Sequence, residues 1–265
     1  FSTFTITLTF ILARRLYSEK AAFIARLIMI TAFWHNLASL QVDVEGSILT
    51  FFYVLAIWAY INLQEKYLKP ETNSPISKIQ PDKQPPWFDL NISPTWKNFK
   101  LKDYISKEHI LLTLALIAIP QVKNNGIFIF PVLFLISTYQ SRKLLQTIKE
   151  LFAPFSLAVL GNIFILGISY LLDPEYIGML FTHGGSRVAP GISLLAIMMI
   201  LFWATPYLLS FLGLSLLDKK TRTQKHASTF FIWAFTILIF VVCFVSTGDY
   251  SRYAMNIIPA ISILA

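Results

Sequence analysis

The sequence predicts an all-α fold, that of a polytopic helical membrane protein, from its composition, its long apolar runs and the placement of its basic residues. Hydrophobic residues make up 55% of the 265 residues, charged residues make up only 14%, and the mean hydropathy is +0.61. Soluble domains usually contain about 25% charged residues. The composition therefore excludes an ordinary soluble globular domain.

The apolar runs give the number of expected helices, because a helix that crosses a bilayer needs about 20 residues. We expect about nine transmembrane segments, the first and last truncated: 1–13, 21–41, 46–63, 109–121, 126–139, 151–172, 190–217, 228–246 and 253–265. The pair 109–121 and 126–139 is short and contains two prolines and a glycine, so it predicts either two spans or a re-entrant hairpin. Since the chain opens at Phe1 and stops at Ala265, we expect a fragment of a longer protein.

The basic residues predict which loops share a side, because Lys and Arg are retained in short cytoplasmic loops. If the nine segments alternate, 18 Lys and Arg residues fall in the loops 14–20, 64–108, 140–150 and 218–227. The intervening loops hold only Lys123, Arg187 and Arg252. This bias predicts that the loops near 42–47, 122–125, 173–189 and 247–252 lie on the outer face. It also explains the formal charge of +8 without a nucleic-acid partner.

Three parts of the chain follow from these patterns. Residues 1–63 are expected to form N-terminal transmembrane helices, and residues 109–265 a second set with the outer loop 173–189. The stretch 64–108 between them contains six prolines, which predicts a cytoplasmic connector. Its second half mixes aromatic residues with lysines, which favours an interfacial helix and a partly ordered linker equally.

Two outer-face clusters contain charged residues whose burial near hydrocarbon is costly, which makes them functional candidates. Asp43 and Glu45 flank one residue, and their carboxylates could coordinate a divalent cation or hold an acceptor hydroxyl. His183 and Arg187 enclose a glycine pair, so that backbone N–H groups and the guanidinium could hold a phosphate. Alternatively, the acids are merely tolerated in an outer loop, and the second cluster is a surface turn.

A third cluster contains Asp249, Arg252 and Tyr253. A cation on the outer face opposes the charge bias, so Arg252 needs either a bound anion or Asp249 as its partner. A local ion pair that only shapes the loop is the alternative. Lys123, in a Lys-Asn-Asn-Gly turn, is a weaker fourth candidate. The single cysteine, Cys243, excludes an intrachain disulfide and a cysteine-based metal site.

Two stretches resemble a known family. The run Ser246-Thr-Gly-Asp-Tyr-Ser-Arg-Tyr-Ala-Met-Asn-Ile-Ile-Pro259 is similar to the loop-to-helix junction of integral-membrane glycosyltransferases, and residues 42–60 look like their acidic loop and following helix. Over most of its length the chain resembles the polytopic type C membrane glycosyltransferases, which include the dolichyl-phosphate-mannose protein mannosyltransferases and the 4-amino-4-deoxy-L-arabinose lipid A transferases.

The resemblance implies transfer of a sugar from a polyprenyl-phosphate donor to a lipid, glycan or protein acceptor. The active face would point outward from the plasma (inner) membrane. It implies that Arg187, His183, Arg252, Tyr253 and Lys123 bind the donor phosphate.

For the carboxylates, the resemblance implies that Asp43 and Glu45 act in support. The family's principal catalytic carboxylate lies in an outer loop that this chain lacks, so we expect residues 1–265 alone to be inactive. No cofactor is certain, and a divalent cation would bind at Asp43.

Two other classes of function remain open from the sequence. A transporter or lipid flippase predicts charges near the bilayer midplane and repeated halves. A non-catalytic scaffold predicts that Asp43, Arg187 and Arg252 lie far apart, whereas a transferase predicts that they converge above one cavity. Membrane lipids are expected partners in every case.

Overall fold

The all-α class is confirmed by the computed structural model, which describes residues 1–32, 45–68, 106–141, 144–175, 178, 182, 206–224, 226–244 and 255–265. No strand occurs in these residues. The α-helices are α1 (Ser2–Leu16), α2 (Glu19–Thr31), α4 (Glu45–Leu68), α5 (Lys107–Val122), α6 (Ile129–Ser141), α7 (Leu144–Leu172), α10 (Pro206–Leu217), α11 (Lys219–Thr223), α12 (Ala227–Phe244) and α14 (Ile258–Leu264). Two short 3-10 helices, η3 (Asn124–Phe128) and η4 (Met255–Ile257), precede α6 and α14.

Three helices begin at a polar side chain that accepts a hydrogen bond from the first turn. The hydroxyl of Ser18 accepts from the backbone N–H of Ala21, and the hydroxyl of Ser106 accepts from that of His109. Asp218 accepts from the N–H groups of Lys220 and Thr221. Ser and Asp at this position satisfy N–H groups that have no partner within the helix, which fixes where α2, α5 and α11 start.

Contacts at the helix ends give the directions in which the helices run. The rings of Phe1 and Phe51 are 5.6 Å apart between centroids, whereas Arg15 at the end of α1 pairs with Glu65 near the end of α4. The helices α1 and α4 therefore run parallel and pack on each other, and α2 packs on α1 and α14. We call the two ends of the bundle the Arg15 end and the Thr50 end. Arg15 lies near the end of α1, and Thr50 lies in the N-terminal part of α4.

The later helices alternate in the same way. Tyr53 of α4 donates to the carbonyl of Gly126, in the turn between α5 and α6, so this turn lies at the Thr50 end. Gln140 at the end of α6 donates to Thr229 at the start of α12, which lies at the Arg15 end. Among the described helices from α4 to α6, each helix therefore runs opposite to the one before it in the chain.

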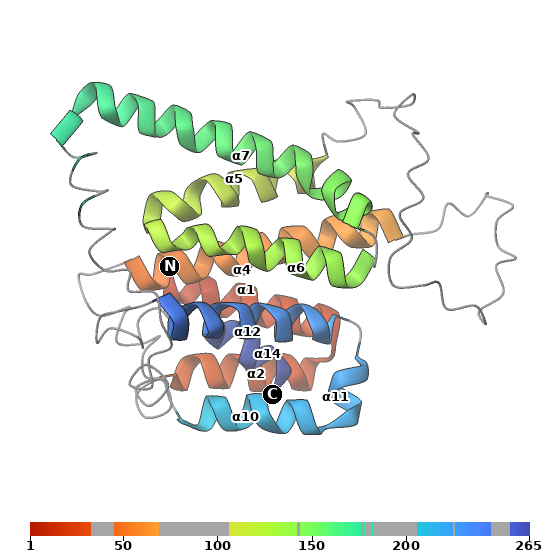
Figure 1. The fold of residues 1–265 in the computed structure, drawn as a ribbon. Coiled ribbons are helices and arrows are strands. Elements are labelled where there is room, and N and C mark those ends of the chain that lie inside the picture. Colours follow the sequence, from red (N-terminus) through yellow and green to blue (C-terminus); the bar gives the residue numbers. More distant parts are fainter. Residues whose placement is uncertain are drawn as a thin grey trace, which may run out of the picture.

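The core lies around α4, which packs against α1, α5 and α6 near the middle of the bundle (Figure 1). Tyr53, Ile57 and Tyr60 of α4 are fully buried, as are Phe230 and Trp233 of α12. The ring of Tyr53 stacks on that of Trp233 with 6.4 Å between centroids. These contacts join the N-terminal helices to the C-terminal ones in a single packed core.

Two helices in the described residues are long and apolar enough to cross a membrane, by length and composition. They are Ser47–Glu65 within α4, of which 67% is buried inside the protein, and Glu150–Leu172 within α7, of which 17% is buried. Shorter apolar helices occur at 126–140, 227–241 and 255–264. The number of nine membrane-spanning segments stays a prediction.

The longest helix, α7, lies along one edge of the bundle and packs mainly on α5 (Figure 1). Pro120 in α5 has no N–H group. The carbonyl of Leu116, one turn earlier, is therefore left without its usual helical donor. The amide of Asn162 in α7 donates to this carbonyl at 3.4 Å, and Gln121 donates to the Asn162 oxygen at 2.6 Å. The proline that interrupts α5 thereby becomes an attachment point for α7.

Candidate functional site

Most of the residues predicted to form a site lie outside the described residues. These are Asp43, His183, Arg187, Arg252 and Tyr253. Glu45 is the first residue of α4, and Lys123 is the residue at which α5 ends. The structure therefore describes the elements on which the predicted loops are mounted, and Lys123 itself.

The Thr50 end carries two buried hydrogen bonds that join elements distant in sequence. The hydroxyl of Thr50 in α4 donates to Asn256 Oδ1 in η4 at 2.9 Å, across 206 residues. One helical turn further along α4, the hydroxyl of Tyr53 donates to the Gly126 carbonyl at 3.3 Å. These four residues, Thr50, Tyr53, Gly126 and Asn256, form what we call the polar floor. They fix the start of α4, the α5–α6 turn and the start of η4 to one another.

The polar floor joins three of the predicted outer loops at their attachment points. In sequence, Asp43 and Glu45 immediately precede the packed part of α4, and Arg252 and Tyr253 immediately precede η4. Lys123 begins the turn that contains Gly126. The loop around Arg187 follows α7, which ends at Leu172, and the other end of this loop lies outside the described residues.

Lys123 is held in a fixed backbone turn. Its N–H donates to the Ile119 carbonyl at 3.3 Å, and its own carbonyl accepts from the Gly126 N–H at 2.8 Å. The turn is close to Ile119, because a Cβ added to Gly126 would lie 2.5 Å from Ile119 Cγ2 and 2.8 Å from the Ile119 carbonyl oxygen. Glycine is therefore required for the close approach between the turn and α5.

The chemistry of the polar floor is neutral, because it consists of hydroxyl, amide and carbonyl groups. Such groups orient a ligand by hydrogen bonds but supply no charge for a phosphate. No group of three His, Cys, Asp or Glu residues that could hold a metal ion occurs in the described part of the chain. The divalent cation expected at Asp43 falls outside the described residues.

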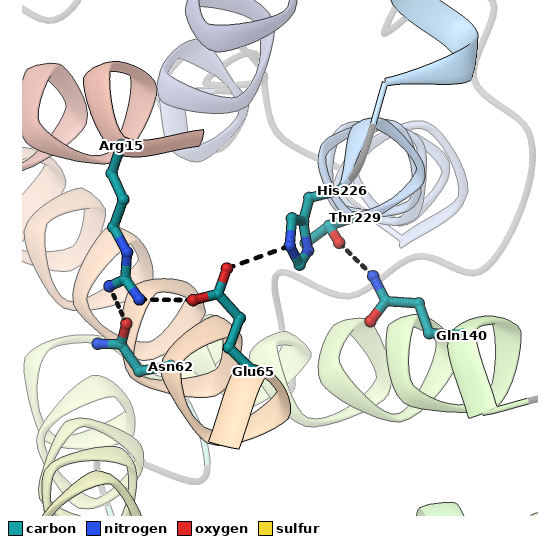
Figure 2. A network of polar contacts seen from close by, with 6 residues as sticks. All are labelled: Arg15, Asn62, Glu65, Gln140, His226 and Thr229. Atoms are coloured by element: carbon teal, nitrogen blue, oxygen red, sulfur yellow. Dashed lines mark hydrogen bonds and ion pairs between the residues drawn. The ribbon is translucent and has the colours of Figure 1, made fainter. Parts of the chain in front are cut away.

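The Arg15 end contains a charged cluster that the sequence analysis did not identify (Figure 2). Arg15 Nη2 lies 2.6 Å from Glu65 Oε2, and Nη1 of the same guanidinium donates to Asn62. The other Glu65 oxygen lies 3.6 Å from His226 Nε2. One carboxylate thereby links α1, α4 and the residue that precedes α12.

The backbone of His226 is strained: its φ of 69° is a value that non-glycine residues rarely adopt. Its side chain is buried, with a relative exposure of 4%. The cluster could not be found from the sequence, because Arg15, Glu65 and His226 are separated by 50 and more residues. The spacing of Asn62 and Glu65 on one face of a helix is the only local signal.

A second polar group lies between α4, α6 and α7 at the same end. Gln64 donates to the hydroxyl of Tyr60, and the hydroxyl of Ser137 donates to Glu150 Oε2 at 3.2 Å. In the turn between α1 and α2, burial raises the pKa of Tyr17, so this phenol stays protonated near neutral pH. Both clusters hold helices together, and neither contains the phosphate-binding set that the sequence predicts.

Comparison with known proteins adds no identity to this geometry. No family model, no curated protein and no solved structure matches the chain.

Proposed function

We propose that the protein is a multi-pass membrane glycosyltransferase that moves a sugar from a polyprenyl-phosphate donor to an acceptor on the outer face. The observation that carries this proposal is the buried hydrogen bond between Thr50 and Asn256. It joins α4, which begins at Glu45 shortly after Asp43, to η4, which follows Arg252 and Tyr253 in the chain. A transferase of this type requires a carboxylate and a cationic cluster close together at one end of the helix bundle.

The proposed topology has nine spans, with the Thr50 end outward. Support comes from the antiparallel order of the described helices and from their basic residues. Described Lys and Arg residues near helix ends gather at the Arg15 end, where the helices carry Arg14, Arg15, Lys20, Lys107, Lys219, Lys220 and Arg222. Retention of basic residues on the cytoplasmic side then makes the Arg15 end cytoplasmic.

The proposed reaction divides the work between the cationic and acidic residues. The acceptor hydroxyl oxygen attacks the anomeric carbon, the bond from this carbon to the phosphate oxygen breaks, and polyprenyl phosphate leaves. Arg187, Arg252 and Lys123 stabilise the charge of the leaving phosphate, which is a large contribution in a site that excludes water. Asp43 and Glu45 hold the acceptor hydroxyl, whose proton passes to a carboxylate base.

The distribution of buried charge favours a transferase over a transporter. Transporters place ionisable groups near the bilayer midplane. Among the residues whose side-chain exposure the structure describes, no Asp, Glu, Lys or Arg is buried. The half-buried acids Glu65 and Glu150 lie at the Arg15 end and pair with groups there.

Binding of a donor-like lipid tests the proposal without requiring turnover. The protein in detergent micelles is titrated with undecaprenyl phosphate and, separately, with dolichyl phosphate. Loss of a charge-assisted hydrogen bond removes about 1.5–3 kcal/mol, so we expect Arg252→Gln and Arg187→Gln each to weaken binding at least tenfold. Lys107→Gln, at the opposite end, is the matched control and should leave the affinity unchanged. Equal affinities in all four proteins would contradict the proposal.

A further inference from the structure

Two helices each present a row of exposed apolar side chains along their length, and exposed Lys and Arg residues follow each row at the Arg15 end. On α10, Leu214 is 61% exposed and Leu217 is 80% exposed, and the next turn is α11 with Lys219, Lys220 and Arg222, all exposed. The proposed function uses these cations only to orient the protein in the membrane and assigns no ligand to them.

The same order of residues occurs a second time, on α2. Phe23 and Leu27 are 63% and 51% exposed, and Lys20 is exposed one turn before Phe23. Arg26 is exposed among these apolar side chains. Side chains on a helix lean toward its N-terminus, so Arg26 extends its guanidinium toward the end that holds Lys20.

Both rows finish at one end of the bundle. The helix α2 starts three residues after Leu16, and α11 ends three residues before His226. Arg15 and His226 contact the same Glu65 carboxylate, which places the start of α2 and the end of α11 at the Arg15 end. Figure 1 draws α11 at the end of the bundle to which α10 and α12 lead.

The acidic residues among these cations are already engaged. Glu19 pairs with Arg14 at 2.7 Å. Asp218 accepts hydrogen bonds from the N–H groups of Lys220 and Thr221 and from the Thr221 hydroxyl at 2.6 Å. The surface around the two rows is therefore positive, with Arg14, Lys20, Arg26, Lys219, Lys220 and Arg222 against two carboxylates.

We propose that these two rows bind anionic phospholipids of the leaflet at the Arg15 end. Lys219, Lys220 and Arg222 on α11, and Lys20 on α2, contact the headgroup phosphates. The acyl chains then lie along the exposed apolar side chains of α10 and α2. The inference depends on the membrane embedding in the proposed function, but not on sugar transfer.

The combination of charge and apolar surface is what selects a lipid as the partner. An acidic protein segment needs the cations alone, whereas a phospholipid fits cations and apolar side chains in this fixed order. Each Lys or Arg near an anionic membrane surface contributes about 1 kcal/mol, which corresponds to roughly a fivefold change in affinity per side chain. Three neutralised cations on α11 should therefore weaken lipid binding more than tenfold.

The test compares nanodiscs of phosphatidylcholine with nanodiscs that also contain phosphatidylglycerol. We expect phosphatidylglycerol to raise the thermal denaturation midpoint of the wild-type protein, with the rise reduced by added salt. The variant Lys219→Gln/Lys220→Gln/Arg222→Gln should lose most of this rise. The matched control Lys219→Arg/Lys220→Arg/Arg222→Lys keeps the charge and should keep the rise.

Several outcomes would overturn the proposal. They are an equal midpoint in both lipids, an undiminished rise in the Gln variant, and an equal rise from inorganic phosphate or from a poly-glutamate peptide. Binding of undecaprenyl phosphate should be the same in the Gln variant and the wild type. Loss of lipid-dependent stabilisation with donor binding intact therefore separates this inference from the proposed function.

Discussion

The helices α4 and α7 are both long and apolar enough to cross a membrane, yet they occupy opposite positions in the bundle. The more apolar of the two, α7, lies at the edge with most of its span exposed, whereas α4 lies in the core. Along α4, Thr50, Tyr53 and Glu65 each bond to a different element. In α7, Asn162 and Glu150 make the described interhelical bonds.

The contrast between α4 and α7 indicates that polar partners, and not hydrophobicity, determine which helix is central. In the membrane that the proposed function implies, apolar side chains would gain nothing by leaving lipid for another apolar surface, so a mainly apolar helix such as α7 can stay at the edge. A helix that carries hydroxyl, amide and carboxylate groups needs partners on several sides. Three comparisons between matched positions and one pH dependence test this interpretation, in order of decreasing expected effect.

Truncation of a packed side chain should separate the two helices most clearly. Ile57 in α4 is fully buried, so Ile57→Ala leaves a cavity and should cost about 2–5 kcal/mol of unfolding free energy. Leu160 in α7 is 62% exposed, so Leu160→Ala should change stability by less than about 0.5 kcal/mol. Unfolding by SDS, followed by circular dichroism, measures both. Similar losses would contradict the assignment of centre and edge.

Addition of a methyl group gives the second comparison. Gly126→Ala forces a Cβ to within 2.5 Å of Ile119 Cγ2 and 2.8 Å of a backbone oxygen that cannot move away easily. Overpacking of this kind should cost about 1–3 kcal/mol. Nothing lies within 4 Å of the corresponding position at Gly167, and Gly167→Ala should stabilise α7 by up to about 1 kcal/mol. A stabilising Gly126→Ala would refute the close approach of turn and helix.

Two ion pairs at the Arg15 end provide the third comparison. The Glu65 side chain is 25% exposed and contacts both Arg15 and His226, so Glu65→Gln should cost about 1 kcal/mol or more. Both members of the Arg14–Glu19 pair are more than half exposed, and Glu19→Gln should cost less than about 0.5 kcal/mol. Thermal denaturation at two salt concentrations distinguishes them, because salt screens the more exposed Arg14–Glu19 pair more strongly.

The smallest effect is expected at α11 and depends on pH. Hydrogen bonds from the Thr221 hydroxyl and N–H hold the pKa of Asp218 below its ordinary value of 3.8. The folded state therefore gains stability above this pH, and the gain is lost as the pH falls through the lowered pKa. Asp218→Ala should reduce the denaturation midpoint slightly at pH 6 and should match the wild type at low pH. A constant difference at every pH would exclude the carboxylate as the cause.

Much of the fold could be predicted from the sequence, because apolar runs are local. The run 46–63 corresponds to α4, the run 151–172 to the apolar part of α7, and the run 228–246 to α12. The exact starts could not be predicted, since α2 and α5 begin directly after the capping residues Ser18 and Ser106, outside the apolar runs. The sequence also did not reveal that α4 is central, because its partners are far away in the chain.

For the candidate site, the sequence could predict the kinds of residue but not the framework that holds them. Arg252 and Asp43 were selected because charges on the outer face are costly, which is a local argument. The bond between Thr50 and Asn256 spans 206 residues and has no local signal. The Arg15, Glu65 and His226 cluster was missed for the same reason.

The proximity of Asp43 and Arg252 at the Thr50 end can be tested by cross-linking the two predicted loops that contain them. In a Cys243→Ser background, Asp43→Cys is combined with Arg252→Cys and treated with a flexible bifunctional maleimide. The account predicts an intramolecular cross-link in this protein and none when Asp43→Cys is combined with Lys107→Cys at the Arg15 end. A cross-link in the second protein, or its absence in the first, would contradict the account.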